Sequence, residues 1–280
     1  MSRRRRAGLI IRDNPLGVFG LLVVLLLSVF AIFAPLLAPF DPDTIRAGPL
    51  RANPSLDHLF GTDDLGRDML SRVIFGARIS LIVGFSAVIF GTLTGAAIGI
   101  FSGYVGGWMD SVIQRTVDTL IAFPALLLLL ILRQVLGASL QTLIIAIGIA
   151  IIPGVARVVR GAVLSERNNQ YVEAARALGA STPRILIVHI TPNVIALAII
   201  VMTKLLGTAI LAEAALSFLG LGIPTAITWG GDVSSARNAF PIHIWWAFFP
   251  GLAITLTVLG FNLLGDSLRD IFDPRLRGRL

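Results

Sequence analysis

Two charged side chains, Lys204 and Glu213, stand alone in a long apolar run and are the first candidates for functional chemistry. A charge at the centre of a membrane helix costs about 2.5 to 3.5 kcal/mol, so such residues commonly face a path or another chain. Their spacing corresponds to about 900° of helix and 13.5 Å along its axis, so they cannot pair within one straight helix. We expect Lys204 to line a pathway or a subunit interface, with a snorkelling lysine as the alternative. Glu213 is interpreted as a gate residue or an interfacial charge.

A second group of charges lies in a short polar segment, where three carboxylates surround one arginine. Its residues of interest are Gly61, Thr62, Asp63, Asp64, Gly66, Arg67 and Asp68. Clustered carboxylates can hold Ca²⁺, but the spacing of an EF-hand loop, with its closing Glu at position 12, is missing. We therefore predict a folded loop stabilised by ion pairs, with a calcium site as the alternative.

The sequence lacks the residues needed for thiol chemistry, metal binding or nucleotide binding by a phosphate loop. The sequence has no Cys, and His58, His189 and His243 fall in different segments, so we expect neither thiol chemistry nor a metal site. Leu205 follows the only lysine, which excludes a Gly-x-x-x-x-Gly-Lys-Ser/Thr phosphate loop. We expect no catalytic residue and no cofactor in this chain.

The elements that must position these residues are membrane helices. Hydrophobic residues make up 55% of the sequence and charged residues 14%, which is outside the range of ordinary soluble domains. A span needs about 20 mostly apolar residues. We predict an all-α polytopic membrane protein with six transmembrane helices at Pro15–Ala38, Ile79–Phe101, about Thr116–Leu136, Leu140–Val159, about Val194–Glu213 and Trp245–Gly265.

The first and third spans allow alternatives. The first follows a basic segment, Arg3 to Arg6, as a signal peptide would, but its apolar run is longer than an h-region of about 7 to 15 residues, which favours a retained anchor. In the third, Asp118 and Arg133 enclose only about 21 Å of helix at 1.5 Å per residue. We expect Arg133 to snorkel toward an interface.

Arginine and lysine counts predict the orientation. With the N-terminus inside, the inner segments carry 15 of these residues and the outer segments 7, which places both termini and the segment Arg160 to Asn193 in the cytoplasm. The predicted organisation is a basic cytoplasmic N-terminus (1–14), a first transmembrane helix (15–39), an extracytoplasmic loop (40–78), a core with five spans (79–265) and a cytoplasmic tail (266–280). A glycine stripe in the second span, at Gly91, Gly95, Gly99 and Gly103, predicts close helix packing.

The polar segment 160–193 has its own helical pattern. Asn169 can cap a short helix with Glu173 in its first turn, and Gly179 is a natural helix end. Thr182 can cap a second helix with Pro183 in the first helical position. Small side chains at Ala174 and Ala175 would let another surface approach closely, which is typical of a docking element; a merely helix-forming Glu-Ala-Ala tripeptide is the alternative.

The combination of Glu173, Ala174, Ala175, Gly179 and Pro192 resembles the signature loop of ABC importer permeases. Further segments resemble the C-type subunit of the dipeptide/oligopeptide branch, at His58–Asp68, Gly76–Ser80, Glu213–Gly222, Asn262–Asp266 and Asp273–Arg275. The resemblance implies a type I importer permease fold in which those five loop residues form cytoplasmic coupling helices between spans four and five.

The resemblance also implies partners. These are a second homologous permease, two ATPase subunits that carry ATP and Mg²⁺, and an extracytoplasmic solute-binding protein that meets the outer loop. A peptide is the expected substrate, with nickel complexes or glutathione as alternatives. An ion-coupled secondary transporter is a different possibility, but it predicts an inverted repeat that the sequence does not show, and a non-transporting scaffold would leave Lys204 without a purpose.

Overall fold

The computed structural model describes residues 14–272, and the side chains of residues 14–270. The basic N-terminal segment and the Asp273–Arg275 motif therefore lie outside the described residues. Within the described part the chain contains helices and no β-strand, in the order α2 (Pro15–Leu37), α3 (Met69–Val105), α4 (Gly107–Ala122), α5 (Ala125–Leu136), α6 (Leu140–Glu166), α7 (Gln170–Ala177), α8 (Thr182–Arg184), the π-helix η1 (Ile185–Ile190), α9 (Thr191–Phe218), α10 (Trp229–Ala236) and α11 (Ile244–Phe272).

Five helical segments are long and apolar enough to cross a membrane. They are α2, α3, α6, the continuous run from α8 through α9, and α11. A sixth crossing is formed if α4 and α5, which meet at an angle of 96°, count as one broken span. The all-helical, polytopic prediction is confirmed.

The third span differs from the single helix that we expected over Thr116 to Leu136. It begins at Gly107 and breaks between Ala122 and Ala125. Phe123 and Pro124 both have extended ψ angles, 134° and 122°. Proline lacks the N–H of a helical residue and disfavours the helical conformation of the residue before it, so the helix ends and restarts in a new direction.

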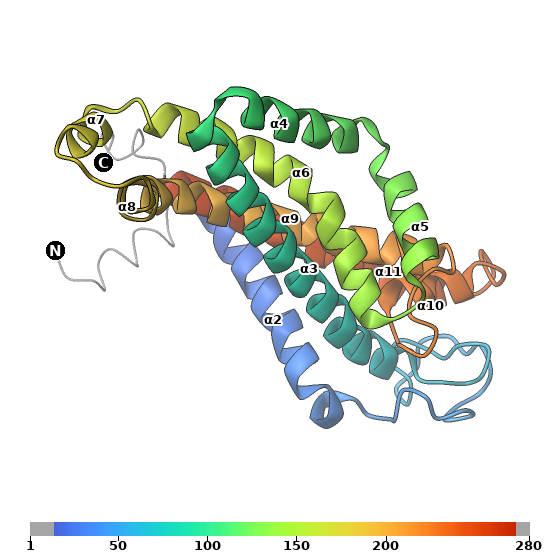
Figure 1. The fold of residues 1–280 in the computed structure, drawn as a ribbon. Coiled ribbons are helices and arrows are strands. Elements are labelled where there is room, and N and C mark those ends of the chain that lie inside the picture. Colours follow the sequence, from blue (N-terminus) through green and yellow to red (C-terminus); the bar gives the residue numbers. More distant parts are fainter. Residues whose placement is uncertain (1–13, 273–280) are drawn as a thin grey trace, which may run out of the picture.

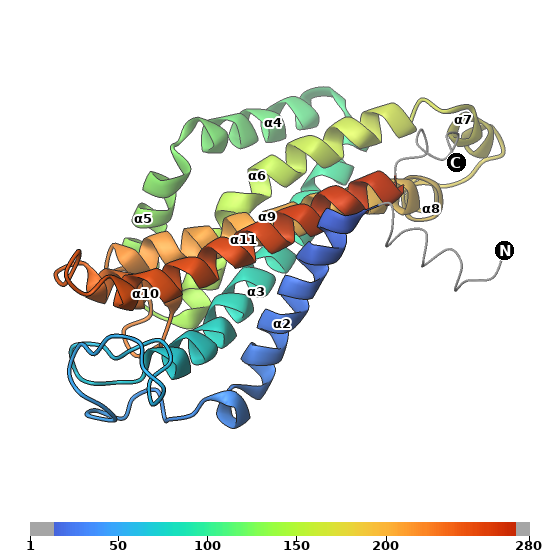
Figure 2. The same cartoon turned by 180° about the vertical axis from the view of Figure 1, so that it is seen from behind.

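Helix α3 lies at the centre of the bundle, and α6, α2 and α9 pack along it. Helix α11 packs on α2 and α9 (Figure 2). The glycine stripe of α3 faces α6: a Cβ on Gly95 would lie 2.8 Å from the Ile152 carbonyl oxygen, and one on Gly99 would lie 2.6 Å from that of Ala156. The predicted close packing at this stripe is confirmed.

Several helices extend beyond the boundaries that hydropathy suggested, because polar groups cap or continue them. The Asp68 carboxylate accepts a hydrogen bond of 2.8 Å from the Ser71 N–H and caps α3, which starts at Met69 instead of Ile79. The predicted outer loop is therefore shorter than 40–78. Helix α6 continues to Glu166, and α11 reaches Phe272, well into the segment that we expected to be a tail.

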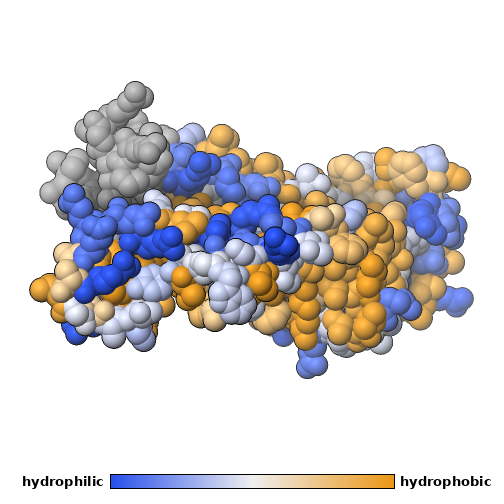
Figure 3. All heavy atoms as spheres, turned by 45° about the horizontal axis from the view of Figure 1, so that its top comes forward, coloured by the Kyte–Doolittle hydropathy of each residue, from blue (hydrophilic) through white to orange (hydrophobic). Residues whose placement is uncertain are grey.

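The two polar ends of the bundle are clearly separated (Figure 1). Helices α7 and α8 lie at one end, together with the last turns of α6 and α11, and the loop between α2 and α3 lies at the other end with α10. In Figure 3 hydrophilic side chains gather toward the α7 end, over part of the forward face and again at the opposite edge, and hydrophobic side chains dominate between the centre and that edge.

Candidate functional site

The polar segment between α6 and α9 folds as a helix, a glycine turn and a second helix. Gly179 has a φ of +80°, in the left-handed region that favours glycine. The Gly179 N–H donates to the Arg176 carbonyl and the Ala180 N–H donates to the Ala175 carbonyl, both at 3.0 Å. These two bonds form a Schellman motif, which ends α7 and turns the chain.

The surface of α7 is open to a partner. Glu173 and Ala174 are exposed, Ala175 is half-buried, and Val172 holds the helix to the protein as a fully buried side chain. The side chain of Leu178, at the tip, is 89% exposed. Small and exposed side chains beside one apolar group give a protruding element that a cleft in another protein can enclose.

The helix starts in this loop differ in detail from the predicted caps. Asn169 occupies the cap position of α7, but its side chain donates to the Glu166 carboxylate at 2.8 Å and makes no capping bond. Ser181, not Thr182, occupies the cap position of the second helix, and Pro183 lies in its first turn. Pro192 lies in the first turn of α9, at the return to the membrane.

Tyr171 ties α7 to both neighbouring spans. Its hydroxyl donates to the Glu166 carboxylate at the end of α6 and accepts a hydrogen bond of 3.0 Å from the Asn193 amide at the start of α9. The same amide donates to the His189 carbonyl at 2.8 Å. Burial, followed by the neighbouring Glu166, raises the pKa of the Tyr171 phenol, so the hydroxyl keeps its proton. A force on α7 can therefore reach α6 and α9 through this residue.

A second polar cluster joins the C-terminal end of α3, the start of α4 and the C-terminal half of α6. The Arg160 guanidinium donates to the Asp110 carboxylate with an Nε–Oδ1 distance of 2.6 Å, and the Ser102 hydroxyl donates to the same oxygen. Arg167 donates to the Gly103 carbonyl at 2.9 Å. These contacts connect the helix that leads into the polar loop with two of its neighbours.

Lys204 and Glu213 lie on different faces of α9 and have different partners. The Lys204 ammonium lies 2.6 Å from the Asp266 carboxylate of α11, and both side chains are partly exposed, at 41% and 61%. Glu213 is fully buried and accepts hydrogen bonds from Ser80 at 3.0 Å and Ser217 at 2.7 Å. Of the two interpretations of this residue, a gate residue or an interfacial charge, the burial of its side chain favours the gate residue.

The loop before α3 is compact. Buried Asp63 pairs with Arg67 at 2.5 Å, and buried His58 contacts Asp68 at 2.9 Å. Gly61 and Gly66 have φ angles of +75° and +74°, and Thr62 forms a bridge to Asp68, whereas Asp64 is exposed. Among residues 14–270 no group of three or more carboxylate, His or Cys side chains could hold a metal ion. The loop contains an ion pair of the kind that we predicted, between Asp63 and Arg67.

Arg133 has an environment that the sequence did not reveal. Its side chain is buried, in contrast to the expected snorkelling. Its guanidinium donates to the carbonyls of Leu221 and Gly222, both at 2.8 Å, and to the carbonyl of Ser139 at 2.9 Å. This arginine holds the end of α5 to the turn after α9, and no local sequence signal identifies partners so far along the chain.

A further ion pair missed by the sequence analysis connects α3 with α10. Arg72 donates to one carboxylate oxygen of Asp232 from both Nε and a terminal nitrogen, at 2.8 and 2.6 Å. Beside it, the indole of Trp229 donates to the Val73 carbonyl at 2.8 Å. Both contacts are buried and hold α10 against the N-terminal end of α3.

Comparison with known proteins assigns the family. Residues 95–278 match the model of the binding-protein-dependent transport system inner membrane component. Residues 2–54 match the N-terminal transmembrane domain of oligopeptide transport permease C. The chain belongs to the ABC importer permeases, in the C-type dipeptide/oligopeptide branch.

The alignments with similar permeases extend over nearly the whole chain. The dipeptide transport system permease protein DppC of Alkalihalophilus pseudofirmus is 42% identical over 95% of this chain and 88% of its own length. The oligopeptide transport system permease protein OppC of Bacillus subtilis is 42% identical over 99% and 91%. The glutathione transport system permease protein GsiD of Escherichia coli is 44% identical over 95% and 89%. The multi-pass importer permease fold inferred from the sequence is confirmed.

Proposed function

We propose that this chain is the membrane-spanning subunit of an ATP-driven importer that moves peptides across the plasma, or cell inner, membrane. The open surface of α7 is the observation that carries this proposal, since Glu173, Ala174 and Gly179 lie on a protruding element fixed to two spans. Membership of the importer permeases supports it independently. Glutathione or a nickel complex is the alternative substrate.

In this proposal the chain performs no chemistry of its own. Two ATPase subunits bind ATP and Mg²⁺, and one of them receives α7 in a cleft on the cytoplasmic side, where both termini of this chain also lie. A second homologous permease completes the membrane assembly, and a solute-binding protein docks near the ion-paired loop on the outer side.

Closure of the ATPases would move α7 as a rigid element. Tyr171 would transmit this movement to the ends of α6 and α9, and the tightly packed α3–α6 pair would turn with them. Rigid-body rocking of spans is a recognised way to switch access to a central cavity. Lys204 is placed on the pathway or at its subunit interface, and Glu213 is proposed as a gate residue because it joins α9 to α3 through Ser80.

Co-purification tests the docking step. A tagged wild-type chain, extracted from its native membranes, should bring down ATPase subunits and a second permease with ATPase activity. Glu173→Arg should lose the ATPase subunits, because it reverses the charge on the exposed face of α7. Asp57→Arg is the matched control, since Asp57 is also exposed but lies in the loop before α3.

Two outcomes would contradict the proposal. Retention of active ATPase subunits by the Glu173→Arg variant would show that α7 is not the docking element. Purification of the wild-type chain alone, with transport driven by an ion gradient, would replace the importer with a secondary transporter.

A further inference from the structure

One face of α11 is left uncovered along most of its length. Exposed or half-exposed residues recur there every three or four positions, at Phe248, Gly251, Thr255, Leu259, Asn262 and Asp266. A spacing of three and four residues places side chains on one face of a helix. The neighbours α2 and α9 pack on α11 along its other sides. The uncovered face is apolar at its outer end and polar at its inner end.

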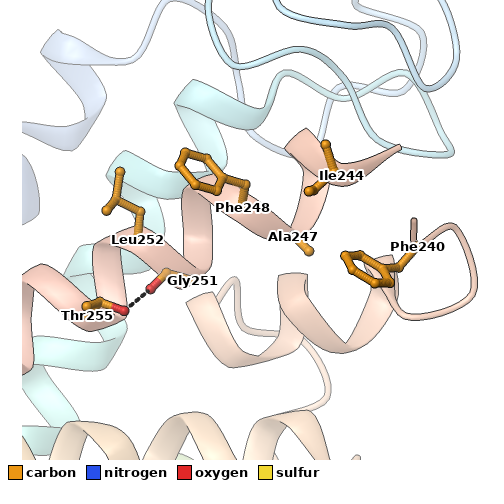
Figure 4. A pocket seen from close by; sticks show the side chains of 7 residues that line it. All are labelled: Phe240, Ile244, Ala247, Phe248, Gly251, Leu252 and Thr255. Carbon is orange, nitrogen blue, oxygen red and sulfur yellow. Dashed lines mark hydrogen bonds between the residues drawn. The ribbon is translucent and has the colours of Figure 1, made fainter. Parts of the chain in front are cut away.

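At the outer end this face forms an apolar groove of about 400 Å³. Figure 4 shows Phe240, Ile244 and Phe248 around it, with Gly251 and Thr255 farther along α11. The Thr255 hydroxyl donates to the Gly251 carbonyl at 2.8 Å. The absence of a side chain at Gly251 helps to keep the surface hollow.

At the inner end the same face carries an amide and a charged pair. The Asn262 side chain is exposed and makes no hydrogen bond to other described residues. Four residues later, Asp266 pairs with Lys204 at 2.6 Å. A Cβ on Gly265 would lie 3.0 Å from Lys204 Cγ, so this glycine leaves room for the aliphatic part of the lysine to lie across α11 and reach the carboxylate.

The hydrocarbon core of a membrane is an unfavourable environment for the polar part of this face. Both charges and the amide belong to segments that can cross a membrane, Thr182–Phe218 and Ile244–Asp270. Polar groups at such positions almost always face the protein interior or a water-filled cavity. A hollow face that changes from aromatic to charged side chains matches a route for a solute better than a flat surface packed against another helix.

We propose that this face of α11 lines the translocation pathway and that the Lys204–Asp266 pair receives the charged ends of a zwitterionic peptide. The inference rests on the proposed function and adds to it the residues that contact the substrate. The peptide's ammonium group would exchange for Lys204 at the Asp266 carboxylate, and its carboxylate would meet the Lys204 ammonium. Because the two residues pair with each other when no peptide is bound, the exchange keeps all charges satisfied and binding stays weak enough for release.

The absence of cysteine from this chain makes the test direct. Asn262→Cys is introduced, the whole complex is placed in lipid nanodiscs, and a charged, water-soluble thiol reagent is added. Labelling of this chain is followed by mass spectrometry. Leu25→Cys in α2 is the control, because Leu25 is 52% exposed on an apolar helix that faces outward. We expect Asn262→Cys to react at least roughly tenfold faster, since thiols react as thiolates in water.

The substrate role is tested in the same preparation. Dialanine, delivered by the binding protein, should slow the labelling of Asn262→Cys, and the Asp266→Asn variant should abolish this protection. Equal labelling of the two cysteines, whether α11 contacts lipid or a second permease, would overturn the pathway assignment. Fast labelling without protection would overturn the role of the ion pair. ATPase subunits retained in the same nanodiscs would show that the proposed function stands in either case.

Discussion

Replacement of Arg133 by Met tests how the end of α5 is held to the turn after α9. The change keeps a long apolar side chain but removes every hydrogen bond of the guanidinium. The carbonyls of Leu221 and Gly222 then lose donors that both lie 2.8 Å away. The loop that joins α5 to α6 also loses its contact at the Ser139 carbonyl. We therefore expect the membrane domain to lose stability.

The size of the effect follows from these contacts. A buried polar group left without a partner costs about 1 to 3 kcal/mol. Two carbonyls are deprived of their long-range donors, and the gain from no longer burying a guanidinium offsets part of the loss. A net loss of about 2 to 3 kcal/mol is expected. For domains of roughly 150 to 250 residues, 1 kcal/mol shifts Tm by about 2 to 4 °C, so the expected decrease is on the order of 5 to 10 °C.

The measurement is the temperature at which the purified complex loses its native size by gel filtration after heating. Arg115→Met is the matched control, because Arg115 is exposed on α4 in the same broken span. We expect the control to change Tm by less than about 1 °C, as exposed substitutions commonly do. If Arg133→Met is as stable as the control, the guanidinium does not hold these elements, and the stabilisation inferred from its hydrogen bonds is wrong.

Two further predictions concern helix packing and coupling. Gly99→Val should destabilise the complex by about 1 to 3 kcal/mol through overpacking, because a Cβ there would lie 2.6 Å from the Ala156 carbonyl oxygen. Gly154→Val is the control, since the space around Gly154 is open. It should have less than half this effect in the same gel-filtration assay. Tyr171→Phe should leave the ATPase subunits bound but lower transport per ATP hydrolysed about two- to fivefold. The change removes the half-exposed hydroxyl that links α7 to α6 and α9, whose hydrogen bonds are worth about 0.5 to 1 kcal/mol. Unchanged transport per ATP hydrolysed would show that α7 acts through other contacts.

Local patterns in the sequence predicted the features that depend on local physics. The glycines of α3 recur at helical spacing and do pack on α6, and Gly179 does take the left-handed conformation that ends α7. The break at Pro124 had a local signal as well, because proline disfavours helix before and at its own position. Hydropathy averaged over a whole span concealed that signal, and the third helix was wrongly expected to be continuous.

Partners distant in the sequence could not be predicted in this way. Lys204 was expected to line a pathway or a subunit interface, and its spacing from Glu213 excluded that residue as a partner without indicating another. Asp266 becomes its neighbour because α9 and α11 pack side by side with Gly265 at the contact. Arg133 likewise finds carbonyls that only the folded chain brings near. Charged residues in apolar segments indicate that a partner exists, and tertiary packing decides which one.

Buried polar groups with hydrogen-bond partners mark the rigid part of the molecule, and exposed polar groups mark the surfaces proposed to contact partners or substrate. Along α3, Arg72, Ser80 and Ser102 each contact a carboxylate of another helix, and these contacts are buried. A helix held at several depths in this way, with glycines against α6, is suited to move as one body with its neighbours. Exposed polar side chains are frequent on α7 and on the C-terminal half of α11. Helix α9 packs on both this scaffold and α11, so a movement imposed at α7 can reach the α11 face without being absorbed by loose packing.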